Sequence, residues 1–154
     1  MIKPVLGLKL GRRLVGAAAL ADETFVFHDL RYVSSRRDRW ESAMTRYFQT
    51  LLEQVKPTYV CYYAPTTLQT TTNRLVLLLE QTAGEAGVAA HRLTKSELLD
   101  HFAFTPIRTR GQLRDQLQAL WPVLAEGKVG RQAVLAEAAA AALMGELRHE
   151  LPPA

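Results

Sequence analysis

The hydrophobic pattern changes its period near residue 40, and this change limits the folds that the chain can adopt. Before it, three segments of strand type follow one another with short turns between them, at residues 4–10, 14–21 and 24–33. Connections this short join antiparallel strands. After it, apolar residues between Trp40 and Val55 recur at the spacing of one helix face. The pattern predicts an antiparallel meander followed by a helix.

Strands and helices then alternate to the end of the chain. Residues 58–63, "TYVCYY", form the continuous apolar run that is typical of a strand buried on both faces. The polar segment 66–74, "TTLQTTTNR", is predicted to be a loop, and residues 88–93 a short fifth strand. Thr94 and Glu97 have the spacing of a capping box at a helix start. The other helices are predicted over residues 74–84, 109–121 and 131–150.

This order predicts an α/β fold with a mixed five-stranded sheet flanked by helices, in a single domain of residues 1–154. Three of the strands are expected to be antiparallel, and two are added through helical crossovers. The hydrophobic fraction of 48% and the charged fraction of 22% are typical of a soluble globular protein. No apolar run is long enough to span a membrane, and the start lacks the apolar core of a secretory signal. Cys61 is the only cysteine, which excludes an intrachain disulfide and a cysteine zinc site and favours a cytoplasmic protein.

Basic residues gather in two connecting segments. The net charge is +4, which favours anionic partners without identifying one. Arg36, Arg37 and Arg39 precede the first helix, and Arg108, Arg110 and Arg114 lie around the start of a later one. Such positions suit contacts with nucleic-acid phosphates, although a solvated surface explains them as well.

The order of elements, with "GLKLG" in the first strand, resembles the RuvC-type Holliday-junction resolvases, which have the ribonuclease H-like fold. The segments that are similar to elements of that family, in order, are residues 5–20, 39–63, 70–87, 108–117 and 136–147. The resemblance implies a ribonuclease H-like fold, binding of branched DNA and a homodimer. It also implies two magnesium ions, held by acidic residues from the first strand, the fourth strand and the final helix, that hydrolyse a phosphodiester.

The chain departs from the family at these acidic positions. The resemblance places Lys9 where the first aspartate belongs, Tyr63 where the glutamate belongs, and only Glu137 on the final helix. A lysine ammonium has no lone pair to offer a metal, and one glutamate cannot hold two divalent ions. We therefore expect no cofactor, no bound metal and no catalytic residue. Lys9 could pair with Glu137, lie at the edge of the sheet, contact a phosphate, or have a new catalytic role.

The resulting hypothesis is a catalytically inactive relative of the resolvases that binds branched or other structured nucleic acid. A membrane is not expected among its partners. The binding residues that it names are Lys9, Arg36, Arg37, Arg39, Arg108, Arg110 and Arg114. One alternative is an active metal-dependent endonuclease with a rearranged site, in which Glu137 acts with Asp22, Asp29 or Asp100. Another is a protein-interaction module that no longer binds nucleic acid.

The helix from Arg74 to Gly84 is the predicted dimer contact. Apolar residues occupy every position from Leu75 to Leu79, so they point in all directions around the helix. Either a second helix of the same chain or another subunit must cover the outer side. The resemblance favours a homodimer with Leu75, Leu78 and Leu79 in its interface.

Overall fold

A computed structural model describes residues 4–22, 24–66, 69–100 and 110–150. Its strands are β1 (Val5–Leu10), β2 (Leu14–Ala21), β3 (Thr24–Tyr32), β4 (Tyr59–Tyr63) and β5 (Ala89–Leu93). Its helices are α1 (Trp40–Val55), α2 (Thr70–Glu85), α3 (Lys95–Asp100), α4 (Arg110–Leu120), the 3-10 helix η1 (Pro122–Ala125) and α5 (Val129–Glu150). Within these ranges, no helix is long and apolar enough to cross a membrane.

The strands form one sheet in the order β3-β2-β1-β4-β5. β1 pairs antiparallel with β2, which pairs antiparallel with β3, as the short turns predicted. β4 lies parallel to β1, and β5 parallel to β4, after crossovers through α1 and α2. The predicted mixed sheet is confirmed.

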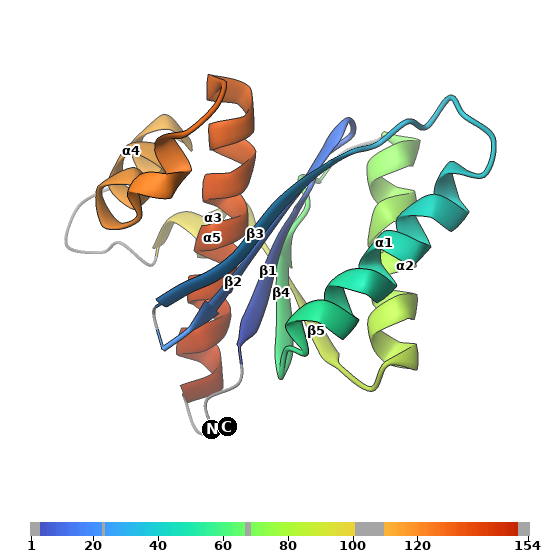
Figure 1. Ribbon diagram of the computed structural model, residues 1–154, viewed down its shortest axis with the longest axis horizontal. Coiled ribbons are helices and arrows are strands. Elements are labelled where there is room, and N and C mark those ends of the chain that lie inside the picture. The colour runs from blue at the N-terminus through green and yellow to red at the C-terminus, as the bar shows by residue number, and fades with distance from the viewer. Residues whose placement is uncertain (1–3, 23, 67–68, 101–109, 151–154) are drawn as a thin grey trace.

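Two helical layers cover the two faces of the sheet (Figure 1). Helices α1 and α2 pack against each other on one side, whereas α5 lies along β1, β2 and β4 on the other, with α3 and α4 beside it. Side chains on a strand alternate between these layers. In β1, Leu6, Leu8 and Leu10 enter the core under α1 and α2, whereas Gly7 and Lys9 face α5.

Helix α5 lies unusually close to the sheet. A Cβ atom added to Gly7 would lie 2.2 Å from the carbonyl oxygen of Ala138, and one added to Gly16 would lie 2.8 Å from Val134 Cγ1. The residues from Ala138 to Ala142 are all alanine and all buried. Small side chains on both layers therefore allow α5 to lie close to the sheet. Any longer side chain between the two layers must fit into this narrow space.

The structure corrects two predicted boundaries. The segment from Thr70 to Arg74, predicted as part of a loop, forms the first turns of α2. Threonine is a poor helix former, but Thr72 is buried, so tertiary packing overrides its propensity. Helix α5 also begins at Val129, two residues before the predicted start. The capping box is confirmed, because Glu97 N donates to Thr94 Oγ1 and Thr94 N to Glu97 Oε1, each at 3.1 Å.

Candidate functional site

Lys9 and Glu137 form a buried ion pair between the sheet and the final helix. Lys9 Nζ donates a hydrogen bond to Glu137 Oε2 over 3.1 Å. Lys9 is 4% exposed and Glu137 is 1% exposed. The close approach of α5 brings the carboxylate within reach of β1. Of the roles open to Lys9, pairing with Glu137 is the one that the structure contains.

Tyr63 completes this cluster from the neighbouring strand. It lies opposite Lys9 in the parallel pairing of β4 with β1. The Lys9 ammonium sits 4.7 Å from the centroid of the Tyr63 ring, within the range of a cation–π contact. The structure therefore brings together Lys9, Tyr63 and Glu137, the three positions that the resemblance singled out. We refer to them as the Lys9 cluster.

The Lys9 cluster does not fit a magnesium site. Magnesium takes hard oxygen ligands in octahedral geometry, usually carboxylates. The cluster offers one carboxylate, and the ammonium of Lys9 stands 3.1 Å from it, where a metal would need to bind. Throughout the described part of the chain, no three His, Cys, Asp or Glu side chains are grouped as metal ligands.

Of the acids named for a rearranged site, Asp29 points away from Glu137. Asp29 lies on β3 and accepts a hydrogen bond from the Tyr47 hydroxyl on α1, at 2.7 Å. It therefore points to the layer opposite α5. Asp22 occupies the turn between β2 and β3, and the side chain of Asp100 lies outside those that the structure describes.

Tyr62, next to Tyr63, serves the opposite face of the sheet. Its hydroxyl donates a short hydrogen bond to Glu80 on α2. Burial raises the pKa of Tyr62 above its ordinary value, and the bond to the Glu80 carboxylate adds to this rise. Tyr63, by contrast, packs in the core layer that contains residues of α5.

Arg36 and Arg37 line a pocket that also contains two arginines of another turn. Arg12 and Arg13 follow β1, and the antiparallel pairing of Leu14 with Tyr32 sets their turn beside the loop after β3. The pocket is lined by Arg12, Arg13, Tyr32, Val33, Ser34, Ser35, Arg36 and Arg37, and none of these described residues is acidic. We call it the arginine pocket. It lies at the end of the sheet where β1 finishes, at Leu10, the residue after Lys9.

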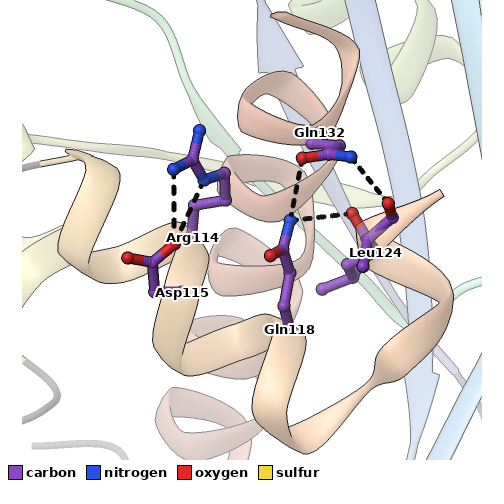
Figure 2. A network of polar contacts seen from close by, with 6 residues as sticks. Arg114, Asp115, Gln118, Leu124 and Gln132 are labelled. Carbon is purple, nitrogen blue, oxygen red and sulfur yellow. Dashed lines mark hydrogen bonds and ion pairs between the residues drawn. The ribbon is translucent and has the colours of Figure 1, made fainter. Parts of the chain in front are cut away.

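The other predicted arginines are distributed differently. Arg39 lies just before α1, in the left-handed backbone region with φ 63°, beside Arg36 and Arg37 in a second hollow. Arg114 is on α4, where it pairs with Asp115 at 3.3 Å (Figure 2). Arg108 lies outside the described residues, as does the side chain of Arg110. Arg12 and Arg13 were not predicted from the sequence, although the predicted meander places their turn next to the Arg36 loop.

Side-chain amide hydrogen bonds join helix α4 to α5 and to η1. Gln118 Nε2 donates to Gln132 Oε1 at 3.2 Å and to the carbonyl oxygen of Leu124 at 3.1 Å (Figure 2). Leu117 is also fully buried against this layer. Arg114 is therefore carried on a helix that is joined to α5.

The three leucines predicted for a dimer interface are buried within the chain. Leu75, Leu78 and Leu79 belong to the core under α1 and α2. Helix α1 packs against α2, so a helix of the same chain provides part of the cover that the sequence required. Leu77, by contrast, is 57% exposed. The role of the three leucines in an interface stays a prediction.

The fold is that of the RuvC-type resolvases within the ribonuclease H-like class, as the sequence predicted. RuvC of Thermus thermophilus, solved in complex with a Holliday junction substrate, has a TM-score of 0.75 and 15% identity, with 92% of each chain covered. A second structure of Thermus thermophilus RuvC has a TM-score of 0.73 at the same identity and coverage. No protein-family model matches the chain. No curated protein matches it either.

Proposed function

We propose that this chain is a catalytically inactive RuvC-like protein that binds branched or otherwise structured DNA. The observation that carries the proposal is the Lys9 cluster. It lies where β1, β4 and the final helix meet, which the resemblance assigns to the metal ligands. An ammonium and a phenol stand there beside a single carboxylate.

The arginine pocket supports the binding part of the proposal. Phosphate contacts require cations at positions that nucleic acid can reach, and they carry no sequence information. Four arginines from two turns line this pocket beyond the end of β1. The structural neighbour was solved with a Holliday junction, and the chain shares its fold. The proposal keeps Arg39, Arg108, Arg110 and Arg114 as predicted binding residues, whereas Lys9 contributes only if its pair with Glu137 opens.

The proposal includes a homodimer, because the resemblance implies a two-fold protein that addresses a two-fold junction. Sedimentation equilibrium across a range of concentrations measures the dimer. If the protein is a monomer at all of them, the dimer is rejected while junction binding can still be tested.

A gel-shift experiment tests both parts of the proposed function. A labelled four-way junction and a linear duplex of the same arm sequence are each incubated with the protein at low and moderate salt. Each mixture is run with chelator, with magnesium and with manganese. Junction binding without cleavage in any metal is expected. Metal-dependent nicking would establish the active-nuclease alternative, and failure to bind either DNA would favour the protein-interaction module.

A further inference from the structure

Tyr32 gives the arginine pocket an exposed aromatic ring. It is the last residue of β3, and it is 58% exposed. Arg131, in the first turns of α5, donates from Nε and Nη2 to the Tyr32 hydroxyl at 2.9 and 2.6 Å. The same guanidinium lies 5.3 Å from the centre of the Tyr32 ring. The ring is thereby held in place from a second element while much of it stays open to solvent.

The four arginines line the same pocket as this ring and make it positively charged. Arg12 and Arg13 come from the turn after β1, and Arg36 and Arg37 from the loop after β3. The backbone fixes the two segments to each other, because Val33 N donates to the Arg13 carbonyl oxygen at 2.9 Å. A further bond of 2.9 Å, from Arg37 N to the Ser34 carbonyl oxygen, closes the loop. These hydrogen bonds therefore fix the backbone of both segments that carry the arginines.

The geometry points to a binding site for unpaired nucleotides, in which Tyr32 stacks on a base and the arginines contact the neighbouring phosphates. This inference rests on the proposed function and specifies which part of a branched nucleic acid the pocket takes. Cationic grooves with aromatic platforms bind single strands, since every base has a face on which a ring can stack. In an intact duplex those faces are covered by neighbouring base pairs. A held, exposed ring therefore adds affinity only where bases are unstacked, as at a branch or an open end.

Fluorescence of 2-aminopurine tests the stacking contact. The probe is placed in a single-stranded oligonucleotide and, separately, in a duplex of the same sequence, because stacking on an aromatic ring quenches its emission. Wild type is compared with Tyr32→Ala and Tyr32→Phe. Arg46→Gln, which removes a charge from the exposed surface of α1 outside the pocket lining, is the control. Thermal unfolding of each variant checks that it is folded, and the junction gel-shift is run in parallel.

We expect wild type to quench the single strand and leave the duplex unchanged. Tyr32→Ala should lose the quenching and weaken single-strand binding about 5- to 100-fold. Tyr32→Phe retains the ring and loses the hydroxyl bonds to Arg131, so it should keep most of the quenching.

Three outcomes would overturn the inference. If Tyr32→Phe and Tyr32→Ala lose the same affinity and quenching, Tyr32 only orients Arg131. If Tyr32→Ala binds the single strand as wild type does while the junction is still bound, the stacking site is wrong and the proposed function stands. If wild type binds neither DNA, both are wrong.

Discussion

Lys9 and Glu137 are separated by 128 positions in the sequence, and their charged groups meet 3.1 Å apart between β1 and α5. Both side chains are withdrawn from water, so the ion pair supplies part of the hydrogen bonding and charge that water would otherwise supply. The pair is thus a specific link between the first strand and the last helix.

Replacing Glu137 with glutamine should destabilise the protein strongly. Glu137→Gln leaves the Lys9 ammonium buried without its counter-charge, for which a loss of about 3 to 5 kcal/mol is expected. Urea denaturation measures this free energy of unfolding. The double variant Lys9→Met with Glu137→Leu removes both charges and should be much closer to wild type. If Glu137→Gln is as stable as wild type, the ion pair does not hold α5 in place.

Restoring carboxylates to the Lys9 cluster should create a response to magnesium. The variant Lys9→Asp with Tyr63→Glu, beside the native Glu137, puts three acidic side chains where the proposed function infers lost metal ligands. Their repulsion should lower the melting temperature in chelator, and magnesium should raise it again, because a bound metal stabilises the folded state. The uncharged variant Lys9→Asn with Tyr63→Gln is the matched control. Equal stabilisation of wild type by magnesium would argue against the inferred loss of the metal site.

Adding one methyl group at Gly7 should displace α5. The new Cβ would lie 2.2 Å from the Ala138 carbonyl oxygen and 2.3 Å from the Ala142 nitrogen, and backbone atoms cannot move aside as side chains do. We expect Gly7→Ala to lower the free energy of unfolding by at least about 3 kcal/mol, which is at the upper end for overpacked cores. Gly84→Ala, inside α2 where an added Cβ would meet no packing neighbour within 4 Å, should instead gain about 0.5 to 1 kcal/mol. Denaturant midpoints of the two variants on opposite sides of wild type would confirm this contrast.

The ion pair between Arg74 and Glu41 should make stability depend on acid pH. Arg74 Nη2 donates to Glu41 Oε2 at 2.7 Å, and Arg74 Nε donates to Oε1 at 3.0 Å. The hydrogen bond from Arg74, with burial acting against it, lowers the pKa of the Glu41 carboxyl below its ordinary value of 4.5. The unfolded chain therefore takes up this proton first as the pH falls. The stabilisation is complete above about 4.5 and is lost as the pH falls through the lowered folded value.

Urea midpoints measured above and below pH 4.5 check this dependence. Glu41→Gln should flatten the acid part of the profile, and the effect should be small because both groups are substantially exposed to water. Glu53→Gln, an exposed change elsewhere on α1, is the control. A profile of Glu41→Gln as steep as that of wild type would show that other carboxylates dominate.

Arg37 should contribute to junction binding through a phosphate. Arg37→Gln is expected to weaken binding to junctions of different sequence alike, and to reduce the slope of log affinity against log salt by about 1. Arg46→Gln removes the same charge from outside the arginine pocket. Gel shifts over a salt series compare the two variants. The same slope in both would mean that the pocket makes no contact that is specific to Arg37.

The sequence predicted the sheet because its strands are joined by short turns and its crossovers contain helices. It missed the start of α2, because the burial of Thr72 depends on a core that local propensity does not describe. It named pairing with Glu137 among the roles of Lys9, but the choice required the position of α5. That position depends on Gly7 and Gly16, which accept a helix backbone from far along the chain. Arg12 and Arg13 were missed because the strand pairing, rather than their spacing, brings them to Arg36.

The burial of the Lys9–Glu137 pair also constrains how the chain can evolve. A change at either position alone passes through a protein with an uncompensated charge inside it, which selection for folding tends to remove. Positions 9 and 137 should therefore co-vary, so that homologues that differ at one of them also differ at the other. If position 9 once held a carboxylate, as the proposed function implies, its return would require passing through such a destabilised protein, so the ion pair makes that change hard to reverse.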